Sequence, residues 1–187
     1  NPHRMISHSD GIYLIERYDP NRIPILMIHG LRSNPLTWEP LTRAVLSTLD
    51  IHERFQVWHA FYPTGLPPFY TGSRIRDVLH KVLFHFDPEG DDLPSRQMAV
   101  IGHSMGAVIS HMLVSNDDGA IWRATFKVPP NELQVDESRR AEMLDIFSIR
   151  HESQIGFVAF VAAPHRGSDM ADSLIGRVGS SIVNLPA

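Results

Sequence analysis

The chain has 187 residues, 43% of them hydrophobic and 20% charged, a balance that predicts one soluble globular domain with a sizeable core. Its formal net charge of −4 gives no electrostatic case for a nucleic-acid partner or an anionic membrane. Because the chain has no cysteine, disulfides, thiolate metal sites and a cysteine nucleophile are excluded.

No other composition signal points to a bound group or a compartment. The eleven histidines follow no metal-binding spacing, so metal binding is possible but unsupported, and no metal ligand is assigned. No apolar stretch approaches the roughly 18 residues that predict a membrane span. No signal peptide is visible either, and the compartment, cytoplasm or secreted, stays open.

The first half of the chain alternates strand-like and helix-like segments. Apolar runs between turn residues predict strands at 11–18, 23–28 and 55–62. The second run is apolar throughout, which is typical of a central parallel strand, and Pro24 must then lie near its start. Helices are predicted at 36–49 and from an N-cap at Ser73 through Phe86, the latter with an apolar stripe at helical spacing.

The second half continues the same alternation with one interruption. A strand at 97–101 leads into a helix at 105–114, and the apolar run 157–163 predicts a buried strand. Strands alternating with helices indicate an α/β fold, with a mostly parallel sheet and helices on both faces. Residues 116–153 are too many for an ordinary connection. They form either a helical excursion at the sheet edge or a cap over a functional site.

The motif Gly102-His103-Ser104-Met105-Gly106 follows the fourth predicted strand directly. A G-x-S-x-G sequence between a strand and a helix is the pattern of a nucleophile elbow, in which a strained turn exposes the serine. The glycines are needed because a Cβ at either flank would crowd this turn. We therefore predict that Ser104 is a catalytic nucleophile.

A second motif provides candidates for stabilising an oxyanion. In this architecture one donor is the backbone N–H after the nucleophile, here Met105, and the other comes from the loop after an earlier strand. Gly30 follows the strand at 23–28, so we predict that the Leu31 N–H is the second donor. His29 is expected to hold this loop. His103 is expected to point away from the serine and to support the site.

Three stretches of the chain resemble motifs of lipase-like bacterial α/β-hydrolases. They are residues 18–38, residues 102–106, and Ala163-Pro164-His165-Arg166-Gly167-Ser168. The resemblance covers nearly the whole chain, and it implies an α/β-hydrolase domain over residues 1–187 with 116–153 as a cap-like insertion. It also implies hydrolysis of a small-molecule or lipid ester without a cofactor. Ala163 stands where the family usually has threonine, and Ala107 where a third glycine is frequent.

The region after Ala163 shows no further strand pattern, although the family places its catalytic acid and base on loops after later strands. One interpretation is that only the N-terminal two-thirds of the fold is present, with the triad Asp and His on a C-terminal segment or a second chain. The other is a base within these residues. His165 is the candidate for it, although a supporting role is favoured.

The sequence therefore predicts a serine hydrolase that cleaves carboxylic esters, a lipase or esterase, through an acyl-enzyme on Ser104. Two alternatives stay open at this point. The chain is a non-catalytic fragment or scaffold that lacks its base, or it is an acyltransferase on the same fold.

Overall fold

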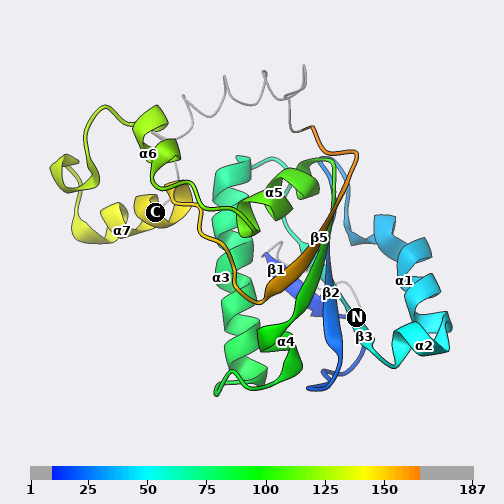
Figure 1. Cartoon of the computed structure of the whole chain (residues 1–187). Helices are drawn as coiled ribbons and strands as arrows, with labels where there is room; N and C mark the ends of the chain where they lie inside the picture. Colours follow the sequence, from blue (N-terminus) through cyan, green and yellow to red (C-terminus); the bar gives the residue numbers. More distant parts are fainter. Residues whose placement is uncertain (1–9, 165–187) are drawn as a thin grey trace, which may run out of the picture.

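The computed structural model describes residues 10–164 of the chain, which fold as a sheet between helices (Figure 1). The strands are β1 (Gly11–Leu14), β2 (Ile23–Ile28), β3 (Phe55–Phe61), β4 (Met98–His103) and β5 (Ile155–Val161). The helices are η1 (Pro35–Trp38), α1 (Glu39–Ser47), α2 (Leu49–His52), α3 (Pro68–Phe86), α4 (Leu93–Arg96), α5 (Met105–Leu113), α6 (Ala120–Thr125), η2 (Pro130–Glu132) and α7 (Glu137–Phe147). None of the helices between residues 10 and 164 is long and apolar enough to cross a membrane.

The five strands form one sheet in the order β1-β3-β2-β4-β5. Only β1 is antiparallel to its neighbour, and the other pairs are parallel. Helices α1 and α2 lie on one face and α3 and α5 on the other (Figure 1). This architecture confirms the predicted α/β fold with a mostly parallel sheet and helices on both faces.

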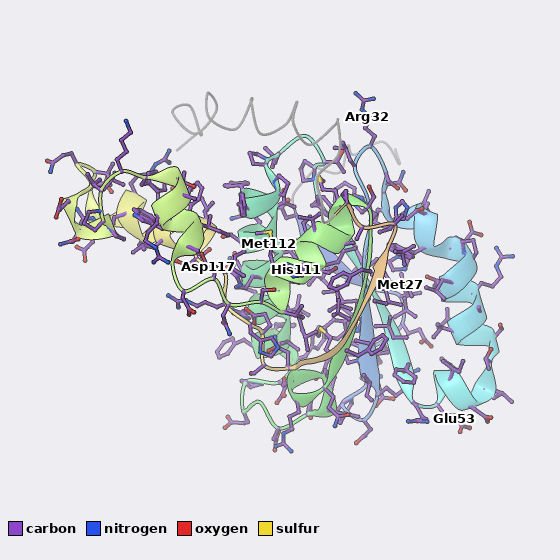
Figure 2. All side chains as sticks on the ribbon, turned by 45° about the horizontal axis from the view of Figure 1, so that its top comes forward. Met27, Arg32, Glu53, His111, Met112 and Asp117 are labelled. Carbon is purple, nitrogen blue, oxygen red and sulfur yellow. The ribbon has the colours of Figure 1, made fainter. Side chains whose placement is uncertain are left out.

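The central strand β2 has the bounds that the sequence predicted. Its residues from Leu26 to Ile28 are fully buried because the strand has a neighbour on each side and helices over each face. Met27 lies in the interior between the sheet and α1 (Figure 2). Pro24 pairs with Gln56 of β3, whereas the pairing with β4 begins only at Ile25. The missing proline N–H therefore falls at the start of the strand, where it costs little.

Two helix predictions are wrong in detail. The single helix expected at 36–49 is divided into η1, α1 and α2, and the extended backbone of Thr48, with ψ of 105°, separates α1 from α2. Leu49, the last residue of the predicted helix, is 74% exposed. Helix α3 begins at Pro68 rather than after Ser73, since proline suits the first helical turn. The Ser73 hydroxyl donates a hydrogen bond to the carboxylate of Asp145 instead of capping the helix.

The two edge strands also differ from expectation. Strand β1 stops at Leu14, four residues before the predicted end at 18. Strand β5 was expected to be buried, but Phe157 is 63% and Val161 44% exposed. Phe157 pairs in register with Ala99, and both lie on the face of the sheet that α1 covers. Helix α1 contacts β3, however, which is three strands away from β5 in the sheet order. The apolar side chains of β5 on this face are therefore only partly covered by the described residues.

The helical segment 116–153 contains α6, η2 and α7 and lies beside the N-terminal half of α3, away from α1 (Figure 1). It has a small core of its own, formed by Trp122, Ile146 and Phe147. Phe147 also lies 6.4 Å from Phe69 of α3, measured between ring centroids. The segment is thus a packing unit with its own core, fastened to α3 and, by the hydrogen bond of Glu152 N–H to the Leu113 carbonyl, to the end of α5.

The start of α5 is pressed against the end of β2 at Gly106. A Cβ at this position would lie 2.2 Å from the carbonyl oxygen of Ile28 and 2.4 Å from that of His29. Backbone atoms cannot yield as flexible side chains do, so only glycine fits. This contact fixes the distance between the end of β2 and the start of α5, which directly follows Ser104.

We predict that Gly106→Ala lowers the free energy of unfolding by at least about 2 kcal/mol, because the helix must move away from β2. Denaturant unfolding followed by circular dichroism measures the change. Gly65→Ala is the matched control, since nothing lies within 4 Å of a Cβ built there. Equal stabilities of the two variants would contradict the prediction.

Candidate active site

Ser104 occupies a strained turn between β4 and α5. Its φ of 52° and ψ of −118° are rare for a residue with a side chain, and such a conformation costs on the order of 1–3 kcal/mol. Its N–H donates a hydrogen bond of 2.9 Å to the carbonyl of Val161, and its carbonyl accepts one of 3.0 Å from Ala107 N–H. The strain is therefore held by β5 on one side and by the first turn of α5 on the other.

The loop after β2 lies directly against Ser104. A Cβ built on Gly30 would lie 3.1 Å from the Ser104 Cβ and 3.0 Å from Nδ1 of His103. Within residues 10–164, neither the Leu31 N–H nor the Met105 N–H donates a hydrogen bond. The structure thus brings Ser104, Gly30, Leu31 and Met105 together at one end of the parallel strands, with two backbone donors unused.

The loop that carries Leu31 also contains a residue with a strained backbone. Arg32 has a φ of 56°, and its N–H donates a hydrogen bond of 3.1 Å to the Thr64 hydroxyl. Its side chain points away from the body of the protein (Figure 2). The threonine therefore holds the backbone of this loop in place while the arginine side chain stays in solvent.

His29 is a buried part of the scaffold beneath the loop. The ring is fully buried, its Nδ1 lies 3.0 Å from the Gly30 carbonyl, and it stacks on Tyr62 at a centroid distance of 4.3 Å. The Tyr62 hydroxyl donates a hydrogen bond to the carbonyl of His29. Burial lowers the pKa of His29, and the hydrogen bond to Gly30 opposes this only in part. His29 is therefore neutral, and its Nδ1–H donates to the carbonyl of Gly30.

Tyr62 directly follows β3 and is almost fully buried. Its role could not be inferred from spacing, because the contact joins residues that lie 33 positions apart. Burial raises the pKa of Tyr62, so the phenol stays protonated and can donate to the His29 carbonyl. The tyrosine thus holds the backbone directly after β2 in place.

His103 packs beside the serine without a polar partner in the part of the chain that the structure describes. Its Nδ1 is buried and makes no hydrogen bond, and the ring stands edge-on to Trp38 at 6.5 Å between centroids. Ser104 Oγ likewise makes no hydrogen bond to any described residue. His165 lies outside residues 10–164. No base for the serine is therefore assigned within the described residues.

A buried charged cluster fastens the end of the helical segment 116–153 to α3. Glu152 lies 3.0 Å from Arg76 Nε and 2.6 Å from His80 Nε2. Burial raises the pKa of Glu152, but the hydrogen bond and charge of His80, together with the Gln154 hydrogen bond and the Arg76 charge, lower it overall. The same hydrogen bond raises the pKa of His80. The cluster forms part of the lining of a cleft of about 550 Å³ between α3 and α7.

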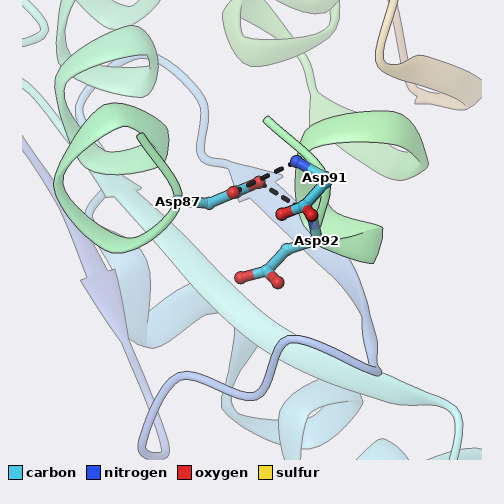
Figure 3. A group of neighbouring side chains, drawn as sticks. All are labelled: Asp87, Asp91 and Asp92. Atoms are coloured by element: carbon cyan, nitrogen blue, oxygen red, sulfur yellow. Dashed lines mark hydrogen bonds between the residues drawn. The ribbon is translucent and has the colours of Figure 1, made fainter. Parts of the chain in front are cut away.

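Three acidic residues gather at the other end of β4, in the loop before α4 (Figure 3). The Asp87 carboxylate accepts hydrogen bonds from the N–H groups of Gly90, Asp91 and Asp92, at 3.0, 3.1 and 3.0 Å. Asp92 accepts one of 2.8 Å from the Tyr18 hydroxyl. These hydrogen bonds hold the loop in its shape and account for the closeness of the three carboxylates. The cluster is therefore not evidence for a cation site.

The chain matches no protein-family model, and no curated protein matches its sequence. Among solved structures it is similar to the mature Bacillus licheniformis lipase BlEst2, with 14% identity and a TM-score of 0.48 over 94% of this chain and 53% of that one. For the esterase EaEST from Exiguobacterium antarcticum the values are 13%, 0.47, 94% and 52%. For the propionate-bound thermophilic esterase Est2 of the Planctomycetes species Thermogutta terrifontis they are 15%, 0.49, 90% and 56%.

The chain thus spans about half the length of these structures. A likeness at such low identity concerns the arrangement of strands and helices and says nothing about activity. The strand order and the helices on both faces are those of an α/β fold with a mostly parallel sheet.

We predict that His29 makes stability fall as the pH drops. Below about pH 6.5 the unfolded chain binds a proton on His29 that the folded protein does not, so acid favours unfolding. The slope is at most about 1.4 kcal/mol per pH unit. Urea unfolding between pH 7.5 and 5.5 should show a steeper loss for the wild type than for His29→Asn.

His59 and His80 are present in both proteins, so their own contributions to the slope cancel in the comparison. Burial lowers the pKa of His59 and adds to the loss in acid, whereas the raised pKa of His80 opposes it. Parallel pH profiles for the two proteins would show that His29 does not titrate as a buried neutral group.

Proposed function

We propose that the protein is a serine hydrolase that cleaves carboxylic esters through an acyl-enzyme on Ser104. The observation that carries this proposal is the strained turn at Ser104, which packs directly against Gly30. A Cβ built on Gly30 would lie 3.1 Å from the Ser104 Cβ. Strain of this kind persists where the surrounding structure holds it, and it clusters at functional sites. The turn has the position and the flanking glycines of a nucleophile elbow.

In this proposal the Ser104 oxygen attacks the ester carbonyl carbon, and the hydroxyl proton passes to a base. The carbonyl oxygen becomes an oxyanion, which the Leu31 and Met105 N–H groups stabilise, and each such donor typically contributes about 3 kcal/mol. Collapse of the tetrahedral intermediate releases the alcohol, which takes up the proton. Water then attacks the acyl-enzyme and frees the acid. His29, Gly30 and His103 position the loop and the turn and do not touch the substrate.

The base and its acid partner are proposed to come from a segment outside residues 10–164, on this chain or on a second one. Ser104 N–H bonds the carbonyl of Val161, so the C-terminal end of β5 lies beside the serine. A segment that follows β5, or a strand added next to it, would deliver its loop to this place. The exposed Phe157 on β5 fits such an addition. His165 is proposed as a supporting residue of this region.

We further propose that the helical segment 116–153 is a cap-like insertion in a single domain that covers residues 1–187. Its own small core and its attachment to α3 support this proposal, because a unit that packs on helices rather than on strands can shift without disturbing the sheet. An ester or lipid substrate would then enter between the cap and the strand ends.

A specific observation favours one alternative, a non-catalytic scaffold. No side chain among the described residues is hydrogen-bonded to Ser104 Oγ, and an unassisted serine is a weak nucleophile. A scaffold would keep the turn and lose the reaction. The two functions therefore differ in a single measurable property, the reactivity of Ser104.

We predict that a fluorophosphonate probe adds once to the wild-type protein and not to Ser104→Ala. Intact-mass spectrometry of both proteins measures the adduct, and hydrolysis of p-nitrophenyl acetate measures turnover. Ser104→Ala should lose labelling and turnover together. The absence of an adduct on the wild type would favour the scaffold, and turnover that survives in Ser104→Ala would place the chemistry elsewhere.

We also predict that Gly30→Ala slows probe labelling by about 10-fold or more, since the added Cβ displaces the donor loop from Ser104. Gly156→Ala on β5 is the control, because nothing lies within 4 Å of its Cβ. Comparing labelling rates of folded protein, checked by circular dichroism, separates this effect from unfolding. Equal rates for the two variants would argue against the proposed oxyanion loop.

A further inference from the structure

A second concave surface lies in the helical segment 116–153, away from Ser104. It is a groove of about 690 Å³ between α6, the loop that follows it and the end of α7. Its wall is largely apolar and aromatic, with Trp122, Phe126, Val128, Pro129 and Leu144 among the lining residues. No residue of the groove belongs to the proposed ester-hydrolysis site.

The aromatic wall of the groove is held in place. The rings of Trp122 and Phe126 lie 4.3 Å apart at 34°, and Trp122 is only 5% exposed. The indole N–H donates a hydrogen bond of 3.0 Å to the Val128 carbonyl. Because this bond uses the only polar atom of the indole, Trp122 contributes an apolar surface. A flexible hydrocarbon chain is suited to such a wall.

The charged residues of the groove have one sign. Arg123 and Lys127 line it, and no carboxylate does, although the chain as a whole carries a net charge of −4. Arg123 Nη1 donates to the backbone carbonyl of Asp118 at 2.9 Å, which leaves its charge uncompensated. Lys127 makes no ion pair with any described residue.

Three other cations of the described chain pair with carboxylates on the same helix, whereas Arg32 and Arg54, like the groove cations, make no ion pair within residues 10–164. Arg43 pairs with Glu39, Lys81 with Asp77 at 2.7 Å, and Arg139 with Glu142 at 3.1 Å. The two groove cations are therefore available to an anion from solution.

We propose that this groove binds a monomeric fatty carboxylate, with the hydrocarbon chain along Trp122 and Phe126 and the carboxylate at Lys127 and Arg123. Apolar burial supplies the affinity for the chain, and the two cations select the anionic head over a neutral one. A neutral alcohol of the same length gains only the first contribution. The proposal does not depend on the reactivity of Ser104.

The test is titration of the full chain with decanoate and with decan-1-ol by isothermal calorimetry, below the micelle concentration. Decanoate should bind more tightly than decanol. Lys127→Ala should weaken decanoate binding by about 3- to 10-fold and leave decanol binding unchanged. Lys81 is the only other lysine, so Lys81→Ala is the matched control and should bind decanoate like the wild type.

The location is tested with 10-bromodecanoate, whose bromine quenches tryptophan fluorescence on contact. Quenching of the wild type should disappear in Trp122→Phe, which keeps an aromatic wall and leaves Trp38 and Trp58 in place. Ser104→Ala should bind decanoate with unchanged affinity.

Several results would overturn the proposal. They are equal affinity for decanoate and decanol, equal weakening by Lys81→Ala and Lys127→Ala, quenching that persists in Trp122→Phe, and loss of binding in Ser104→Ala. Binding to phosphatidylglycerol vesicles without binding to monomeric decanoate would also overturn it, because the groove would then serve a membrane surface.

Discussion

The close contact between the end of β2 and the start of α5 determines where Ser104 lies. Gly106 brings the helix onto the carbonyl oxygens of Ile28 and His29, and Gly30 brings the loop onto the serine turn. Gly106 meets backbone atoms, which cannot change rotamer as a side chain does, whereas Gly30 faces the Ser104 Cβ and the ring and carbonyl of His103. A small displacement of either segment would separate Ser104 from the Leu31 N–H, so the proposed chemistry depends on the packing of these two glycines.

The groups that support this contact are neutral. His29 is buried with a lowered pKa, and Tyr62 is a protonated phenol that donates to the His29 carbonyl. Ion pairs in the same position would need desolvation of both charges, which burial rarely repays. The buried charges of the described chain lie away from this contact, at Glu152 and Arg76, where the helical segment 116–153 returns to the sheet, and at Asp87 in the loop before α4. The neutral groups that hold the β2–α5 contact and the buried charged groups thus lie in different parts of the molecule.

The sequence predicts those features that depend on local patterns. The apolar run of β2 gave correct bounds, and the glycines around Ser104 indicated a sharp turn that the structure contains. Errors occurred where two local signals competed or where distant contacts decided. Ser73 resembles an N-cap, but Pro68 starts the helix earlier and Asp145, 72 residues away, binds the serine hydroxyl.

Contacts between distant segments are the part that local patterns cannot provide. The stacking of His29 on Tyr62 and the placement of α7 against α3 depend on which elements meet in space. The exposure of Phe157 has the same origin, because an apolar run specifies a strand suited to burial but not what covers it. The base for Ser104 belongs to this class as well, since no local pattern within residues 10–164 indicates it.

The two edges of the described sheet are built differently, and this bears on where a base for the proposed reaction would come from. Strand β1 has four residues, and charged Glu16 and Arg17 follow soon after it, as is common for an edge exposed to water. Strand β5 has seven residues without a charge, and within residues 10–164 it pairs only with β4. A parallel strand of this composition is suited to a position with neighbours on both sides. Strand β5, which holds the Ser104 turn in place, is therefore also the strand best suited to pair with a further strand. A parallel strand added there would have its C-terminal end beside Ser104.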